Sequence, residues 1–208
     1  GSGTCASGSR VQAQAGPSTV RTGGVLHVSS GEGTATSSGA ITIRSVNAGA
    51  AGTSGYLSFS SGSSVTGNSG YIHMGTGVAT AGRGGMVLIS VGSGTSSVGG
   101  MVRAHAGRST VHTGGAVVVT SGEGTATSSG VVLIRSSNSG VAGVSGSLLF
   151  SSGTSVTGNS GRVHMGTGAA TAGRGGAVVV TVGSGTSGSG GLVQADGGRS
   201  TVRAGGQL

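Results

Sequence analysis

The sequence predicts an all-β fold, a parallel β-solenoid with 15 to 16 residues per coil and about fourteen coils stacked along one axis. Three observations support this prediction. Glycine accounts for 50 of the 208 residues, apolar residues interrupt the glycine and serine at regular intervals, and the whole chain follows one tandem repeat. The mean hydropathy is +0.22, whereas disordered linkers have low hydrophobicity.

The repeat has two nested periods. The string GEGTATSSG occurs at residues 31–39 and again at 122–130, which gives a long period of 91 residues. Residues 25–115 and 116–206 are identical at 62 of these 91 positions, and each copy divides into five units of 15 residues and one unit of 16. We number the positions of a unit as slots, starting after the glycine that ends the preceding unit. The sequence therefore predicts a superrepeat of six coils.

The repeat register also defines the expected organisation of the chain. Residues 1–24 match the end of a preceding superrepeat, superrepeat one spans 25–115, superrepeat two spans 116–206, and residues 207–208 start the next copy. The sequence predicts that these parts form one continuous solenoid. We expect the chain to be a segment of a longer array, because it begins and ends inside a unit.

Alternating residues at the start of each unit predict a strand over slots 1 to 5. Slot 2 is Val, Ile or Leu in every unit and slot 4 is apolar, as in Val28 and Phe59, so these side chains are expected to face a thin interior seam. Glycine ends every complete unit and usually fills slot 7, which predicts corners that need positive φ or close backbone approach. A second short strand is expected over slots 9 to 12, so that one unit forms one coil.

Charged residues are scarce and strongly biased. All 11 basic residues are Arg, the only acids are Glu32, Glu123 and Asp196, and the net charge is +8. Acid–base catalysis needs clustered titratable groups, and these acids are expected in distant coils, so the sequence predicts no enzyme, catalytic residue, metal site or cofactor. His73 and His164 are 91 residues apart and are not expected to share a metal.

The recurrent pattern xVxVxxGxGTxxxGG, as in residues 177–191, resembles the glycine-rich tandem-repeat parallel β-solenoid proteins, which include large secreted or cell-surface proteins of microbes and algae. The pattern is also similar, more loosely, to ice-binding solenoids with 15-residue coils. The resemblance covers the whole chain and implies a solenoid located outside the cell or at its surface. It is specific for fold and implies little about function.

Slots 1 and 3 point away from the predicted seam, yet many of them are apolar. A strand that is apolar on both faces is normally covered on both faces, which predicts packing against copies of the same chain. The alternative is that β-favouring residues are tolerated on an exposed sheet. The predicted association residues are Val25, Tyr56, Tyr71, Met86, Leu88, Met101, Val118, Val131, Leu133, Leu149, Val179 and Leu192.

Slot 10 carries a regular column of threonine. A flat threonine array suits ice binding, but glycine and arginine interrupt the second column that such a surface needs, which favours a hydroxyl ladder that stabilises the second sheet. Arg108 and Glu123 share slot 8 in consecutive units, so a ladder ion pair is also expected. The predicted threonine ladder consists of Thr34, Thr80, Thr95, Thr110, Thr125, Thr171, Thr186 and Thr201.

These features predict a structural, non-catalytic extracellular or cell-surface protein, a stiff rod that self-associates laterally or end to end into a fibre or appendage. Its expected partners are copies of itself. The alternative is a surface-binding solenoid, either an adhesin to anionic polysaccharide or an ice-binding protein. The dispersed arginines have no aromatic platforms beside them, so nucleic-acid binding is not expected, and no apolar run has the length needed for membrane insertion.

Overall fold

The structure is a computed structural model that describes residues 10–206. Residues 1–9, which include Cys5, and residues 207–208 lie outside the described residues, and so do the parts of the neighbouring superrepeats predicted there. Within residues 10–206 the chain forms no helix and no strand. The prediction of an all-β parallel β-solenoid is therefore wrong.

The chain divides into two compact units, Gly1–Arg103 and Ala104–Leu208. The division falls inside the repeat unit 101–115, whereas the predicted boundary between superrepeats lies between residues 115 and 116.

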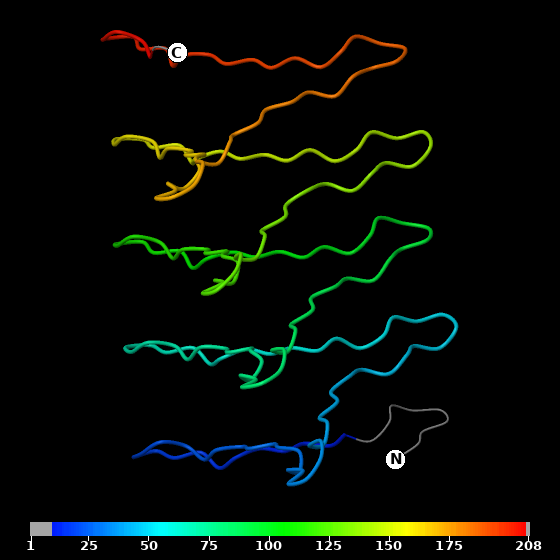
Figure 1. The fold of residues 1–208 in the computed structure, drawn as a ribbon. Coiled ribbons are helices and arrows are strands. Elements are labelled where there is room, and N and C mark those ends of the chain that lie inside the picture. The colour runs from blue at the N-terminus through cyan, green and yellow to red at the C-terminus, as the bar shows by residue number, and fades with distance from the viewer. Residues whose placement is uncertain (1–9, 207–208) are drawn as a thin grey trace. The chain divides into compact units, whose positions relative to one another are not determined.

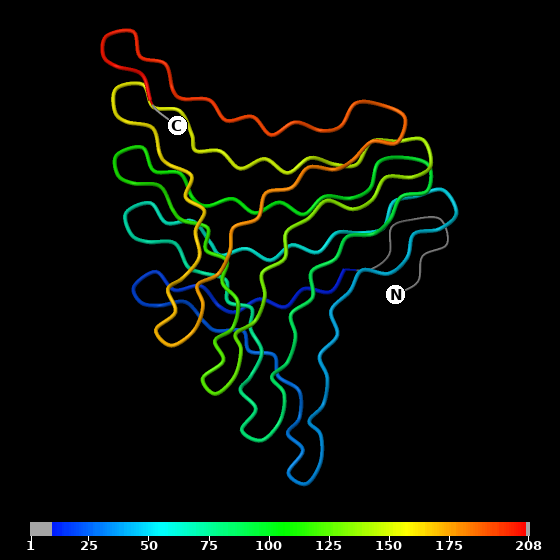
Figure 2. The same ribbon diagram turned by 45° about the horizontal axis from the view of Figure 1, so that its top comes forward.

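Each repeat unit forms an arm, in which the chain runs out, turns at a tip and returns (Figure 2). Slots 1 to 6 form the outgoing leg of the arm. In the 15-residue units a bend occupies slots 10 to 12, for example at residues 34–36 and 125–127. These slots hold mostly small and polar residues, which favour turns over sheet ladders. The bend takes the place of the predicted second strand.

A single hydrogen bond closes the base of an arm. In six arms the amide of the slot-15 glycine donates to the carbonyl oxygen of the slot-7 glycine, as from Gly39 to Gly31 and from Gly130 to Gly122, both at 2.9 Å. In two other arms a slot-6 hydroxyl donates instead, from Thr76 to Gly85 O at 3.3 Å and from Thr167 to Gly176 O at 3.2 Å. Each of these bonds joins two residues of the same repeat unit.

The glycine that ends an arm is required by close approach. A Cβ added to Gly85 would lie 2.9 Å from the Cβ of Thr76 on the opposite leg, closer than real Cβ atoms come to their neighbours. No glycine in residues 10–206 has a positive φ. Of the two roles expected for the corner glycines, the structure therefore shows close backbone approach.

Consecutive arms of the first compact unit point in different directions. Arms 10–24, 25–39 and 40–55 make one circuit, and arm 56–70 then follows the course of arm 10–24 in the next layer (Figures 1 and 2). The second compact unit repeats this order, because arm 147–161 follows the course of residues 104–115. One circuit therefore takes three repeat units, whereas the sequence predicted one unit per coil.

The circuit explains why the alternating pattern does not produce a sheet. A parallel ladder needs equivalent legs beside one another at strand spacing, but consecutive outgoing legs diverge. The hydrogen bonds that join an outgoing leg to another leg go to the return leg of its own arm, which is rich in Gly and Ser and has low β-propensity. At most one backbone bond closes each arm, and no ladder forms within residues 10–206.

No side chain among residues 10–206 is buried. Only Ala15, Gly33, Gly124 and Ser136 are half-buried, and all other described residues are exposed. The predicted interior seam is therefore absent.

Candidate functional site

Within each compact unit, arms that follow the same course share a sequence signature. The arms of the first class carry serine in slot 9 and are called serine arms here. The second class carries Thr-Ala in slots 10 and 11, and the third alternates between 16 and 15 residues. The serine arms are 10–24, 56–70, 101–115, 147–161 and 192–206; the Thr-Ala arms are 25–39, 71–85, 116–130 and 162–176; the variable-length arms are 40–55, 86–100, 131–146 and 177–191.

The slot-9 serine organises the tip of every serine arm. Its Oγ accepts a hydrogen bond from the slot-12 amide, and in two arms also from the slot-11 amide, which is a local serine turn. The bonds to slot 12 run from Arg21 to Ser18 at 3.0 Å, Gly67 to Ser64 at 3.0 Å, His112 to Ser109 at 2.9 Å, Gly158 to Ser155 at 3.1 Å and Arg203 to Ser200 at 2.9 Å.

Sequence reasoning missed this turn and the circuit that it marks. Ser18, Ser64 and Ser109 recur at alternating spacings of 46 and 45 residues, and Ser155 and Ser200 continue the series. The spacing of these five serines indicates the three-unit period, beneath the more visible 15- and 91-residue periods.

Side chains of the outgoing legs alternate between two faces, although these legs are not strands. In arm 10–24 the guanidinium of Arg10 donates to the amide oxygen of Gln12, and Gln12 Nε2 donates to Gln14 Oε1 at 2.8 Å. In arm 192–206, Gln194 Nε2 donates to Asp196 Oδ2 at 2.6 Å. Slots 1, 3 and 5 of these legs therefore share one face, as the periodicity predicted.

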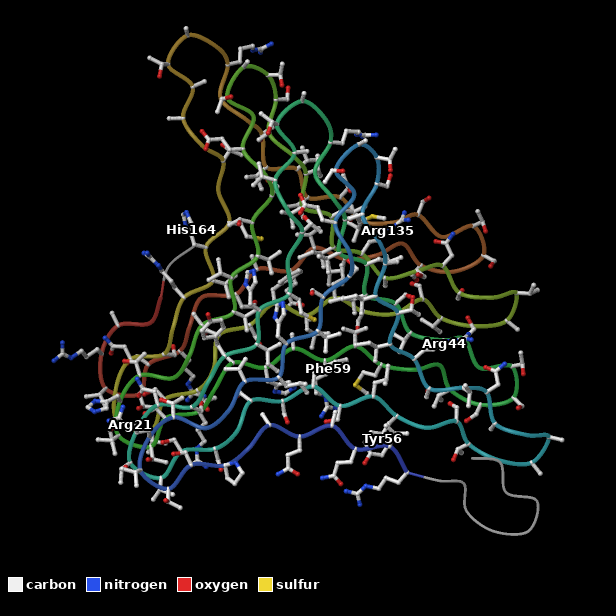
Figure 3. The ribbon with its side chains drawn as sticks, turned by 90° about the horizontal axis from the view of Figure 1, so that it is seen from below. Arg21, Arg44, Tyr56, Phe59, Arg135 and His164 are labelled. Atoms are coloured by element: carbon white, nitrogen blue, oxygen red, sulfur yellow. The ribbon has the colours of Figure 1, made fainter. Side chains whose placement is uncertain are left out.

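The twelve predicted association residues are exposed. Between 69% and 90% of each side chain is accessible, whereas slot-2 residues from residue 25 onward are 47% to 61% accessible. Slots 1 and 3 therefore face outward more fully than slot 2. Tyr56 and Phe59, in slots 1 and 4 of one serine arm, are 90% and 64% accessible (Figure 3).

The association residues are spread over arms of all three classes. The variable-length arms carry five of them, namely Met86, Leu88, Val131, Leu133 and Val179, and the outgoing legs of the three arms that hold these five are apolar in slots 1 to 4. The predicted threonine ladder is divided in the same way, because slot 10 begins the tip bend and the tips point in different directions. The arms of Thr34 and Thr80 follow the same course in the first compact unit, and the arms of Thr125 and Thr171 follow the same course in the second.

The predicted ion pair between Arg108 and Glu123 does not form, because these residues lie in consecutive arms that point in different directions. Arginines lie at arm tips and on outgoing and return legs. Arg21 lies at the tip of a serine arm, whereas Arg44 lies on the outgoing leg of a variable-length arm (Figure 3). Tip arginines are thus held at the end of a loop and point into solvent.

The second compact unit contains a shallow pocket of about 150 Å³, lined by Arg135, Ser136, Ser137 and Asn138. Its walls come from four consecutive residues of one leg, so it is a local curl of the backbone. Across residues 10–206, no three His, Cys, Asp or Glu side chains gather where they could hold a metal ion. His73 lies in the first compact unit and His164 in the second, each in slot 3 of its repeat unit; Figure 3 shows His164 on its leg.

A scan of protein-family models finds no match to the chain, and comparisons with curated proteins and with solved structures also find no match. None of the segments described is a helix of the length and apolarity that crossing a bilayer requires.

Proposed function

We propose that the chain is a non-enzymatic structural protein of an extracellular or cell-surface fibre or appendage, and that its copies pack together through the association residues. The single observation that carries the proposal is the absence of buried apolar side chains among residues 10–206. Removing apolar surface from water is the main favourable term in folding and association. A chain that leaves this surface open is expected to cover it with copies of itself.

The exposed area favours an assembly with many neighbours. The chain exposes 20691 Å² at a mass of 19.1 kDa, whereas a folded monomer of this mass exposes about 8,400 Å². The difference, about 12,000 Å², is many times the roughly 800 Å² that each partner buries in a standard interface. Lateral or end-to-end packing into a fibre covers more of this area than a single dimer contact.

The variable-length arms are the best candidates for the contact. Leu88, Leu133 and Val179 occupy the same slot on legs of this class and are 73% to 76% accessible. Their legs are apolar on both faces, and such legs are normally covered on both faces. The contact is therefore expected to use the outgoing legs and to leave the tips free.

The test compares two triple variants of the full chain by sedimentation velocity and negative-stain electron microscopy. L88S/L133S/V179S removes association residues from the variable-length arms. The matched control V65S/V141S/V156S removes three valines at arm tips, which are fully accessible. We expect filaments or large assemblies for the native chain and the control, and a shift to small species for the leg variant.

A native chain that stays monomeric at tens of micromolar contradicts the proposal, and so does equal loss of assembly in both variants, which indicates non-specific hydrophobic association. A monomer with bare outgoing legs is the outcome that the alternative adhesin or ice-binding function predicts.

A further inference from the structure

We propose that the tips of serine arms 101–115 and 192–206 bind the sulfate or carboxylate groups of an acidic polysaccharide. This inference concerns the arm tips and does not depend on the association residues of the outgoing legs. Both tips lie in the second compact unit, on arms that follow the same course (Figure 2).

The two tips present cations on the same backbone frame. In arm 192–206, Arg199 and Arg203 flank the turn, and Ser200 Oγ accepts from the amides of Val202 at 3.4 Å and Arg203 at 2.9 Å. Arm 101–115 repeats this geometry. Arg108 precedes Ser109, whose Oγ accepts from the amides of Val111 at 3.4 Å and His112 at 2.9 Å. The serine thus fixes the backbone of slot 12 and holds slots 8 and 12 at the two sides of one turn.

The chain contains its own neutral version of this tip. Arm 147–161 lies between the two basic arms along their common course and carries Thr154 and Gly158 in slots 8 and 12. Its turn is nevertheless the same, because Gly158 N donates to Ser155 Oγ at 3.1 Å. The arginines are therefore not needed to form the turn, and a role in contacting an anion accounts for their place beside it.

The residue types favour an acidic polysaccharide as the anion. Arg forms planar, bidentate contacts with sulfate and carboxylate groups, and the chain uses Arg for every basic residue. Neither basic arm contains Tyr or Phe, so the aromatic platforms typical of single-stranded nucleic-acid sites are missing there. Exposed hydroxyls of Ser200 and Thr201 beside the arginines suit hydrogen bonding to a sugar.

The experiment measures binding of the full chain to immobilised dextran sulfate, to polygalacturonate and to neutral dextran at 50 mM NaCl. The tip variant R108T/R199T/R203G replaces the three arginines of the basic tips by the residues that arm 147–161 carries in the same slots. The matched control R44S/R83S/R174S removes the same charge from positions outside the serine tips, where equivalent arms carry Ser90, Ser37 and Ser128. We expect at least tenfold weaker polyanion binding for the tip variant and less than threefold weakening for the control.

A third variant, R108K/R199K/R203K, keeps the charge and removes the bidentate geometry, so we expect intermediate binding. Preference for dextran sulfate or polygalacturonate identifies sulfate or carboxylate as the bound group. Equal weakening in the tip variant and the control overturns the proposal, as does unchanged binding in the tip variant or tighter binding to single-stranded DNA than to either polyanion. The tip variant and the control R44S/R83S/R174S lose the same charge and are expected to sediment alike, with assembly retained in both, so failure of this proposal is distinguishable from failure of self-association.

Discussion

At the scale of single residues, serine is the most informative side chain of this protein. The same Oγ-to-amide bond forms in five tips whose slot-12 residues are Arg, Gly, His, Gly and Arg. The turn therefore depends on the backbone amide and on the serine acceptor, and slot 12 is free to vary. This separation allows cations to be placed on a tip without changing its shape.

We predict that S200A loosens its tip, because the amides of Val202 and Arg203 lose their acceptor. An exposed hydrogen bond of this kind contributes about 0.5 to 1.5 kcal/mol, so these two amides should exchange about two- to tenfold faster by hydrogen-exchange NMR. S200T, which keeps a hydroxyl, is the control and should exchange close to the native rate. Unchanged exchange in S200A would show that the serine bond does not hold the turn.

At the scale of the arm, closure within one unit is the main structural rule. Six arms close through a backbone bond between two glycines, whereas arms 71–85 and 162–176 close through a threonine hydroxyl. The second kind of closure depends on a side chain, so a point substitution can remove this hydrogen bond and leave the backbone groups unchanged.

We predict that T167V opens arm 162–176, because valine has the shape of threonine and cannot donate to Gly176 O. The expected readout is loss of the NMR contacts between residue 167 and Gly176, with T167S retaining them. Arm 116–130 serves as an internal reference, since its backbone bond from Gly130 to Gly122 does not involve this residue. Retention of the contacts in T167V would indicate that packing, and not the hydroxyl, closes the arm.

Sequence reasoning reached the arm only in part. The unit length, the shared face of slots 1, 3 and 5, and a close glycine approach were all predictable, because each depends on residues within one unit. The arrangement of consecutive units was not, because a tandem period does not say which copies become neighbours in space. The alternating apolar residues predict that the leg of one repeat unit pairs with the leg of the next repeat unit, but the structure places the leg with the same course three repeat units away. The slot-9 serines carried that information.

At the scale of the whole molecule, two forces act in opposite directions. Exposed apolar side chains favour association, whereas a net charge of +8 makes copies of the chain repel one another. Charge repulsion is screened by salt, and the screening length falls from about 10 Å at 0.1 M to about 3 Å at 1 M ionic strength. The burial of apolar surface has no such sensitivity to screening.

We predict that salt strengthens self-association and weakens polyanion binding. Raising NaCl from 50 mM to 500 mM should increase the assembled fraction measured by sedimentation, because repulsion between like charges is screened. The same change should release dextran sulfate, because attraction between opposite charges is screened as well. Assembly that dissolves as salt rises would instead indicate that ion pairs hold the copies together.

The three-unit circuit also constrains how a gene for such a chain can grow. Duplication of one 15-residue unit would shift every later arm by one place in the three-arm circuit, so each would point in a different direction. Duplication of a circuit of 45 or 46 residues preserves the directions. A single extra circuit would still exchange basic and neutral serine tips, since these alternate from one circuit to the next. Two circuits make 91 residues, the smallest insertion that preserves both the course of the arms and the chemistry of their tips. The long period is thus the natural step of duplication for this chain.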